Sequence, residues 1–262
     1  MRKYLTLTMA AGALIAISVA AFAFAAAKPN QPGKVKVGNL ELTFNGGFAP
    51  KALPKKTFAP ISLTAEGKIR TTDGTHPPAM KEVIVETDKN GAIDVKGYPT
   101  CTSGALQSRD TKSAEGACKK AIIGEGTTTA EVEFAEQAPI SVDSKLLVVN
   151  GGKKGGTTTL FIHAYFSAPV SGAIVTTLKI SSVKNGRYGT KTIATIPKIA
   201  GGFGSVTDFR LKIDKKFTYQ GKQKSILTAR CADGKLQAHA TAVFSDGTRA
   251  STEILRTCTS KG

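Results

Sequence analysis

Seven Asn-Gly or Asp-Gly dipeptides punctuate this sequence, and they constrain its fold more than any other feature. Both dipeptides tolerate the positive φ angles of two-residue hairpin turns, and most of them lie between apolar, β-branched runs. The seven pairs are Asn45-Gly46, Asp73-Gly74, Asn90-Gly91, Asn150-Gly151, Asn185-Gly186, Asp233-Gly234 and Asp246-Gly247. Their number and spacing predict a chain folded mainly as antiparallel β-hairpins.

The runs between these dipeptides alternate between apolar and polar residues, as half-buried strands do. The alternation is regular from Phe209 to Asp214 and from Leu236 to Ser245, whereas Leu160 to Phe166 is apolar on both faces and is typical of a central strand. Only the stretch from Thr111 to Ile123 has a helical pattern. We therefore expect a mainly β fold, an antiparallel two-sheet β-sandwich with one short helix stapled by a disulfide.

The first 27 residues have the pattern of a secretory signal peptide. Arg2 and Lys3 precede an uncharged stretch that ends in Ala25 and Ala27, which fit an A-x-A cleavage site. A retained membrane anchor is the alternative, because the stretch is just long enough to span a bilayer. We expect residues 28–36 to be a disordered lead-in and 37–262 to form a single β-sandwich domain, with a subdivision near residue 144 left open.

Four cysteines follow the predicted signal peptide: Cys101, Cys118, Cys231 and Cys258. An even number in an exported chain indicates two disulfides, and four cysteines allow three connectivities. Local pairing, Cys101 with Cys118 and Cys231 with Cys258, is the simplest of the three. An extracellular or envelope-associated protein is therefore expected.

Several segments of the sequence point to a family: CTSGALQSRDTKSAEGACKKAIIGEGTTTAEVEF, KLLVVNGG with TTTLFIHAYFSAPV, YGTKTIATIPKIAGGFGSVTDFRLKI and the late cysteine pair. They resemble a broad set of uncharacterised secreted proteins from high-GC Gram-positive bacteria. The likeness extends from about Gly38 to Cys258. It implies the same local cysteine pairing, and because the family carries no known activity, it implies no catalytic residues.

Positive charge is concentrated in the second half of the chain. Residues 28–144 hold 15 Lys and Arg against 14 Asp and Glu, whereas residues 145–262 hold 19 against 5. The densest cluster consists of Arg210, Lys212, Lys215, Lys216, Lys222 and Lys224. It is interleaved with Phe217 and Tyr219 and is a candidate anion-binding surface, although a solvated face that keeps a secreted protein soluble has the same pattern.

Two other motifs resemble functional sites, but the residues around them do not fit those sites. Leu146 to Thr158 imitates a phosphate-binding loop, but Thr157 stands where the lysine belongs and a strand follows in place of a helix. Ser181 and Lys184 have the spacing of a Ser-x-x-Lys nucleophile, but in a strand they point to opposite faces. The sequence predicts no cofactor, no metal site and no catalytic residue.

These observations favour a non-catalytic exported protein that associates through its basic half with an anionic partner. An acidic wall polymer, lipid head groups and extracellular DNA are all compatible with such a surface. The alternative is a secreted hydrolase that acts on a polysaccharide or another wall polymer, with a site that one sequence does not locate.

Overall fold

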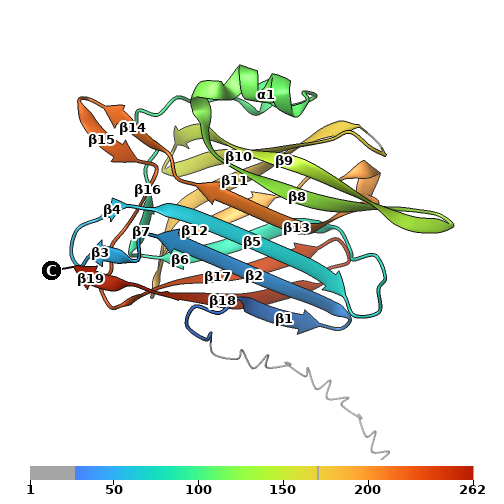
Figure 1. The fold of residues 1–262 in the computed structure, drawn as a ribbon, viewed down its shortest axis with the longest axis horizontal. Helices are drawn as coiled ribbons and strands as arrows, with labels where there is room; N and C mark the ends of the chain where they lie inside the picture. The colour runs from blue at the N-terminus through green and yellow to red at the C-terminus, as the bar shows by residue number, and fades with distance from the viewer. Residues whose placement is uncertain (1–26, 170, 262) are drawn as a thin grey trace, which may run out of the picture.

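The computed structural model describes residues 27–169 and 171–261 of this chain. Apart from Ala27, the predicted signal peptide lies outside the described residues. The main sheet contains twelve strands, each antiparallel to its neighbours (Figure 1). In spatial order they are β1 (Gly33–Val37), β2 (Leu40–Ala49), β5 (Ser62–Thr71), β13 (Gly204–Ile213), β8 (Ile122–Phe134), β9 (Gln137–Lys154), β10 (Thr157–Phe166), β11 (Gly172–Asn185), β12 (Tyr188–Thr195), β6 (Met80–Asp88), β17 (Lys235–Phe244) and β18 (Arg249–Thr257).

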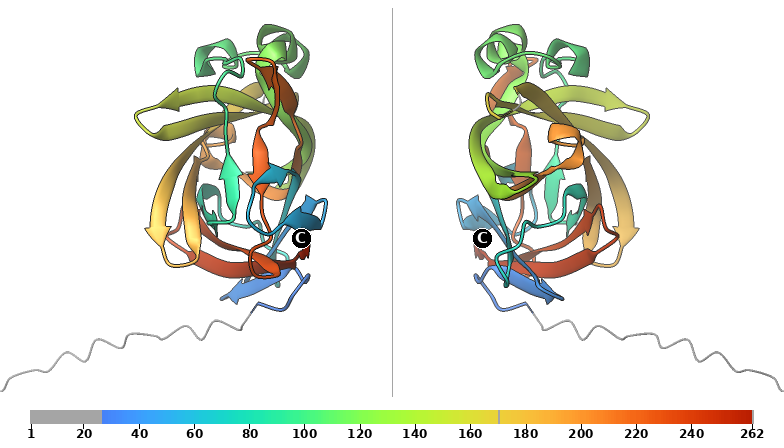
Figure 2. Two further views of the ribbon diagram at one scale, coloured as in Figure 1. Left: turned by 90° about the vertical axis from the view of Figure 1, so that its left-hand side faces the viewer. Right: turned by 90° about the vertical axis from the view of Figure 1, so that its right-hand side faces the viewer.

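The sheet curves around until its two edge strands, β1 and β18, lie side by side (Figure 2). The prediction of mainly β structure with one short helix is confirmed, but the two-sheet sandwich is wrong: the protein is a nearly closed barrel. Alternating residues and tight turns are common to both architectures. What separates them is whether the first and last strands of the sheet meet, and period-2 alternation does not encode that contact.

Two of the seven glycine dipeptides form the hairpin turns that the sequence predicts. Asn185-Gly186 joins β11 to β12, and Asp246-Gly247 joins β17 to β18. In contrast, Asn45-Gly46 lies inside β2 and Asn150-Gly151 inside β9. The second pair sits at a β-bulge, where the Asn150 amide holds the neighbouring loop by donating to the carbonyls of Tyr98 and Pro99.

One end of the barrel is closed by short strands from outside the main sheet. β4 (Ala59–Pro60), β16 (Leu227–Ala229) and β7 (Gly91–Ile93) form a three-stranded sheet. Beside it, β3 (Ala52–Pro54) pairs with β19 (Thr259–Lys261), and β14 (Lys216–Tyr219) pairs with β15 (Lys222–Ser225). We call the three-stranded sheet and the β3–β19 pair the plug. Leu53 and Ala229 are completely buried within it, as is Cys231 just after β16.

The helix covers the outer face of β9 and β10. It comprises α1 (Thr111–Cys118) and a final 3₁₀ turn, η2 (Lys119–Ala121), and a 3₁₀ turn at Ser103–Ala105 (η1) precedes it. Asp110 caps its first turn by accepting a hydrogen bond from the Ser113 backbone N–H at 2.7 Å. Both predicted disulfides are present, with Cα–Cα distances of 5.6 Å for Cys101–Cys118 and 6.0 Å for Cys231–Cys258.

The barrel occupies most of the described chain, including two places where the sequence suggested something else. Gly33–Val37 form β1 in the segment expected to be a disordered lead-in, and β9 runs through residue 144, the proposed subdivision. β1 is ordered because its Val35 and Val37 pack on the cluster of Leu40, Leu42 and Phe44 inside the barrel. Burial of these side chains fixes the segment.

The seam between β1 and β18 has no continuous ladder of hydrogen bonds. The Asn30 N–H donates to the Leu255 carbonyl at 2.9 Å, and the Asn30 side chain bonds to Thr257. Further along, Gly33 approaches β18 so closely that a Cβ on it would lie 2.6 Å from Oγ1 of Thr252. Glycine is required here because any side chain would push the two edges apart.

Arg256 completes the seam from β18. Its guanidinium donates to the carbonyls of Gly46, Gln31 and Leu255, and also to Oδ1 of Asn45. The side chain is only 8% exposed, and burial lowers the pKa of its guanidinium. A single residue therefore ties β18 to β2 and to the segment that leads into β1.

Replacing Arg256 by Leu is expected to lower the free energy of unfolding by about 2–5 kcal/mol, because it leaves several buried acceptors unpaired. Urea denaturation measures the change. Arg249→Gln on the same strand is the control, because Arg249 is exposed and is expected to contribute within about 0.5 kcal/mol. Equal effects of the two substitutions would contradict the role assigned to Arg256.

His163 is completely buried between β10 and the segment that carries the helix. Its Nε2 bonds to the Arg109 carbonyl at 3.0 Å, whereas Nδ1 has no hydrogen-bond partner among the described residues. Burial lowers the pKa of His163, although the backbone hydrogen bond and the nearby Asp110 carboxylate act in the opposite direction. The imidazole is therefore neutral in the folded protein at neutral pH.

Acid should destabilise the protein through this residue. Below about pH 6.5 the unfolded chain gains a proton at His163 that the folded protein does not, so the free energy of unfolding falls until pH reaches the lowered folded-state pKa. The difference in stability between the wild type and His163→Gln should shrink as pH falls from about 7.5 to 5. Chemical denaturation at several pH values measures it, and a constant difference would contradict this account.

Candidate ligand chamber in the barrel

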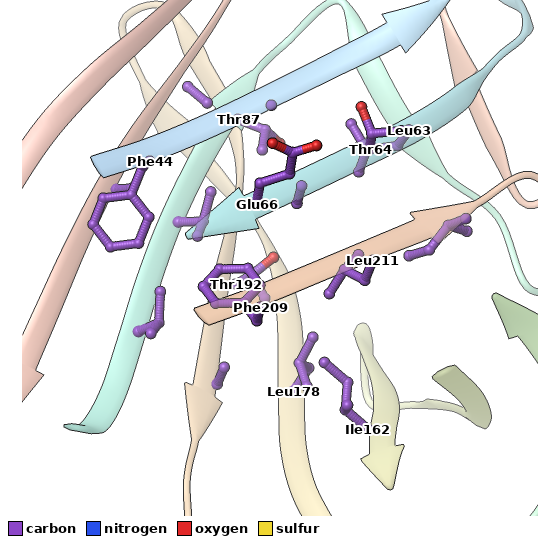
Figure 3. Close-up of a pocket in the computed structure, with 18 of the residues that line it drawn as sticks. Phe44, Leu63, Thr64, Glu66, Thr87, Ile162, Leu178, Thr192, Phe209 and Leu211 are labelled. Carbon is purple, nitrogen blue, oxygen red and sulfur yellow. The ribbon is translucent and has the colours of Figure 1, made fainter. Parts of the chain in front are cut away.

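The interior of the barrel is hollow because twelve strands enclose more space than their side chains fill. Eight strands already give an interior that side chains just fill or that holds one small ligand, and diameter grows with strand number. Here a cavity of about 430 Å³ remains, lined by inward-facing residues of the barrel strands and by the plug. We call this cavity the chamber (Figure 3).

One wall of the chamber is built from small and medium-sized side chains. The inward positions of β12, β6 and β17 that line it are Thr190, Thr192, Ala194, Val83, Val85, Thr87, Ala238 and Ala240. Ala194 lies opposite Val83 in the ladder between β12 and β6, so neither side chain reaches far into the interior. This wall is the direct reason that the chamber is not filled.

The other wall is bulkier and apolar. Phe44 and Phe48 project from β2, Phe209 and Leu211 from β13, and Leu63 from β5. Figure 3 shows Phe209 and Leu211 from β13 together with Ile162 and Leu178 from the strands beyond. The chamber thus lies between a wall of large apolar side chains and a wall of small ones.

The exposure of individual residues also indicates that the space inside β12 and β6 is empty. β12 and β6 are half-exposed at nearly every position, on both the outward and the inward faces. In a filled core the inward residues would be buried, as Leu40, Leu42 and Phe44 are in β2. The inward faces of Val83, Val85 and Thr192 therefore border empty space.

Few polar groups lie along the chamber. Thr87 and Thr190 hydrogen-bond to each other, and Thr128 donates to the Asp208 carbonyl. Within the described part of the chain, the hydroxyls of Thr176 and Thr192 make no hydrogen bond. With the hydroxyl of Thr228 on β16, which also makes no hydrogen bond to a described residue, they are groups that could bond to a ligand.

The charged residues of the lining are already partnered. The Glu66 carboxylate lies on the outer face of β5 and pairs with Arg210 at 3.2 Å, and Arg256 is held by the acceptors of the seam. Asp88, at the plugged end, accepts from Arg187 at 2.7 Å and from the backbone N–H groups of Asn90 and Gln237. The two carboxylates are thus paired with arginines, and the hydrogen bonds of the Arg256 guanidinium are taken up by neutral acceptors of the protein.

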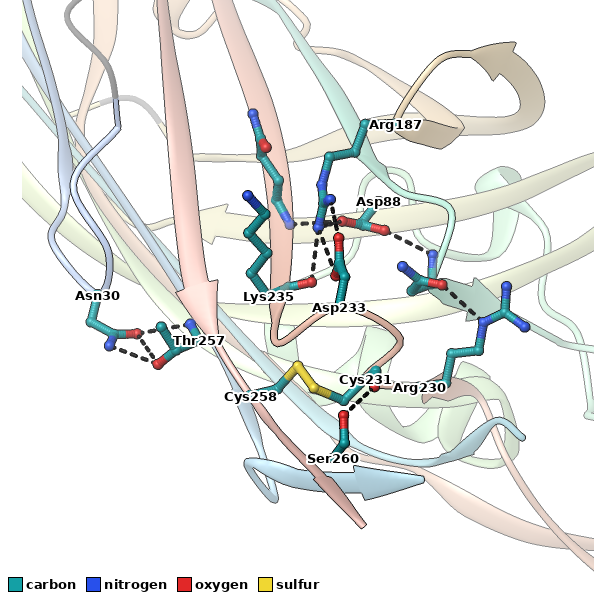
Figure 4. The surroundings of a disulfide bond; sticks show 12 residues. Asn30, Asp88, Arg187, Arg230, Cys231, Asp233, Lys235, Thr257, Cys258 and Ser260 are labelled. Carbon is teal, nitrogen blue, oxygen red and sulfur yellow. Dashed lines mark hydrogen bonds and ion pairs between the residues drawn. A yellow bond between two sulfur atoms is a disulfide. The ribbon is translucent and has the colours of Figure 1, made fainter. Parts of the chain in front are cut away.

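Asp88 belongs to a network that braces the plugged end beside the Cys231–Cys258 disulfide (Figure 4). Arg187 bonds to Asp88, to Asp233 and to the Lys235 carbonyl. The hydrogen bond to Asp233 raises the pKa of Arg187, and the same bond lowers the pKa of Asp233. Both groups stay charged, which fixes the turns that carry them.

The predicted basic cluster is divided between two elements. Arg210 and Lys212 lie on the outer face of β13, where they pair with Glu66 and Asp214. Lys216, Lys222 and Lys224 lie on the β14–β15 hairpin, with Lys215 just before it, and Lys224 pairs with Asp94 at 2.9 Å. Only Lys215, Lys216 and Lys222 of the six form no ion pair with any described residue.

The hairpin that carries these lysines is firmly attached. Tyr219 packs flat against Gly97, where a Cβ would lie 2.1 Å from the ring, and Phe217 meets Tyr98 edge-to-face at 5.1 Å between ring centroids. Its aromatic residues are thus used for packing. The three unpaired lysines are held in place on the surface.

The three histidines of the described residues lie apart from one another and from the chamber. His76 bonds to the Glu131 carbonyl and His163 to that of Arg109, while His239 lies near Glu86 on the outer face of β17. Among the described residues, no group of His, Cys, Asp or Glu could hold a metal ion. Nor does any described helix have the length and apolar character needed to cross a membrane.

Sequence reasoning missed the chamber, although a signal for it existed. The inward face of β17 contains Ala238, Ala240 and Ala242 in succession, and β12 places Thr192 and Ala194 on its inward face. Runs of small residues on a core-facing side are unusual in strands, where larger β-branched residues pack better. The sequence distinguishes the inward from the outward face of each strand, but it does not show which side chains lie across the barrel from the inward face.

No protein-family model, curated protein or solved structure matches this chain. The resemblance to secreted proteins of high-GC Gram-positive bacteria stays a prediction. Function has to be argued from the geometry of the chain itself.

Proposed function

We propose that this protein is a non-catalytic binding protein that holds a small, uncharged, apolar molecule in the chamber of its barrel. The observation that carries the proposal is the cavity of about 430 Å³ behind the small-residue wall of β12, β6 and β17. Its volume falls in the range of about 300–1,000 Å³ that is typical of small-molecule sites.

The chemistry of the lining selects the ligand. Apolar walls favour a hydrocarbon-like molecule by about 25 cal/mol for each Å² of apolar surface removed from water. A peptide segment would bury backbone amides that the lining cannot satisfy. A cation would lose its hydration and find only carboxylates already paired with arginines, and an anion would find only the Arg256 guanidinium, whose donors are already used. The hydroxyls of Thr176 and Thr192 could hydrogen-bond to one polar but uncharged group of the ligand.

The compartment is consistent with such a role. Two disulfides indicate an oxidising environment outside the cytoplasm. Together with the signal-peptide pattern of residues 1–27, they support export. A molecule with little solubility in water needs a carrier outside the cell, and an apolar chamber inside a barrel provides one.

Filling the chamber should abolish binding while the fold is kept. Ala194→Phe adds a ring to the small wall, and we expect the affinity for the uncharged fluorophore N-phenylnaphthylamine to fall roughly tenfold or more. Because the ring fills empty apolar space, the free energy of unfolding should stay equal or rise by about 0.5–2 kcal/mol. Fluorescence titration and urea denaturation measure the two effects.

Thr195→Phe is the matched control. Thr195 is the next residue on β12, and its side chain points to the opposite face of the strand, into solvent. This variant should bind the fluorophore as the wild type does. Absence of saturable binding by the wild type, or equal loss in both variants, would refute the chamber as the site.

A second function is favoured by one specific observation. Lys215, Lys216 and Lys222 are exposed, unpaired with any described acid and held on or beside a rigid hairpin, and the exposed Lys153 lies close enough to influence the Asp94 carboxylate. Such a surface suits weak, salt-sensitive binding of an acidic polymer of the cell envelope. Nothing in the described residues favours the hydrolase that the sequence left open, and it is not proposed.

The triple variant Lys215→Gln, Lys216→Gln and Lys222→Gln should elute from immobilised polyphosphate at lower salt than the wild type. The control removes the same charge from three exposed lysines elsewhere, Lys34, Lys81 and Lys198. If binding depends on the hairpin, the control should elute close to the wild type. Equal losses would mean that only net charge matters.

A further inference from the structure

A second, smaller cavity of about 190 Å³ lies at the end of the barrel away from the plug. Ala130 and Ala200 are among the residues that line it, and we call it the vestibule. Three residues, Phe166, Ile174 and Ile199, line the vestibule and the chamber at once. The two cavities are therefore separated by a partition one side chain thick.

The three residues of the partition differ in how they are held. Phe166 and Ile174 belong to β10 and β11 and are fixed by the ladders of the barrel. Ile199 instead lies on the connection between β12 and β13, outside the main sheet. Phe166 is 5% exposed and Ile199 is 7% exposed, so both are packed closely in the closed state.

The connection that carries Ile199 is attached mainly to itself. The N–H groups of Gly202 and Gly204 donate to the Ile199 carbonyl at 2.9 and 3.1 Å, and that of Phe203 donates to Ala200. Its backbone is bonded to other strands at two points, by the Glu133 N–H to the Phe203 carbonyl and, next to β12, by the Ile196 N–H to the Lys81 carbonyl. A turn held by its own short-range bonds opens at a lower free energy than a barrel strand does.

The backbone of this turn also has an unusual conformation. Ala200, Gly201 and Gly202 have φ angles of 47°, 71° and 113°, in the left-handed region. For Ala200 this conformation costs about 1–2 kcal/mol. The adjoining Phe203 is 64% exposed, which leaves a large apolar side chain on the surface beside the vestibule.

The opposite end of the barrel is held more firmly than the 199–203 turn. There the plug holds Leu53, Ala229 and Cys231 with no exposure, and the Cys231–Cys258 disulfide and the Arg187 network tie its segments together. The segments at this end are therefore held together by covalent and ionic links and not by the bonds of one short turn.

We propose that the vestibule is the entrance to the chamber and that Ile199 is its gate. This inference rests on the proposed function, because it concerns the route of the same ligand. Movement of the 199–203 turn withdraws one side chain and joins the two cavities. An apolar molecule then enters past Phe166 without disturbing any ladder of the barrel.

Stopped-flow fluorescence with N-phenylnaphthylamine tests the gate. Ile199→Ala removes most of the side chain that blocks the passage, so association and dissociation should both accelerate, by roughly tenfold, while the dissociation constant stays within about threefold. Ile199→Val should show a smaller change in the same direction. It costs only about 0.5–1.5 kcal/mol of stability, so it keeps the test valid if the alanine variant does not fold.

Ile93→Ala and Ile93→Val are the matched controls, because Ile93 lines the chamber at the plugged end. They should leave the association rate within about twofold of the wild type. Unchanged rates in folded Ile199 variants, or equal acceleration in the Ile93 variants, would overturn the gate. A wild type that does not bind the fluorophore would instead refute the proposed function, so the two failures are distinguishable.

Discussion

The structure depends on the closure of one twelve-stranded sheet at the seam between β1 and β18. An open sheet exposes two rows of unpaired N–H and C=O groups, and bringing its edges together shields both rows from pairing with another chain. Here the edges meet through the segment that contains Asn30, through the bare backbone of Gly33 and through the guanidinium of Arg256. A buried cation bonded only to neutral acceptors is costly, and it is retained because three separate segments depend on it.

Closure with twelve strands also determines what lies inside. The circumference is too large for inward side chains of ordinary size to fill, so the chain adds a plug at one end and leaves a chamber in the middle. The alanines and threonines of β12 and β17 enlarge that space, while Phe44, Phe48 and Phe209 define its far wall. Because the charges of the lining are partnered, the remaining space is suited to a neutral apolar molecule.

Local features of this fold could be read from the sequence because they depend on neighbouring residues. The turn at Asn185-Gly186, the helix from Thr111 and both cysteine pairs are examples. Asn45-Gly46 failed as a turn because Arg256, 210 residues away, uses both residues as acceptors in an extended strand. The barrel, its chamber and the division of the basic cluster could not be predicted for the same reason. Each depends on which distant strands become neighbours.

The most direct test of this account is a methyl-labelled NMR titration of the protein with N-phenylnaphthylamine. The account predicts saturation at one molecule per chain, with the largest shifts at the methyl groups of Val83, Val85, Leu178 and Ala194, which border the chamber from three strands. Shifts confined to residues around the exposed Phe203 or Ile140, or no saturable shift at all, would contradict the claim that the barrel is a binding chamber.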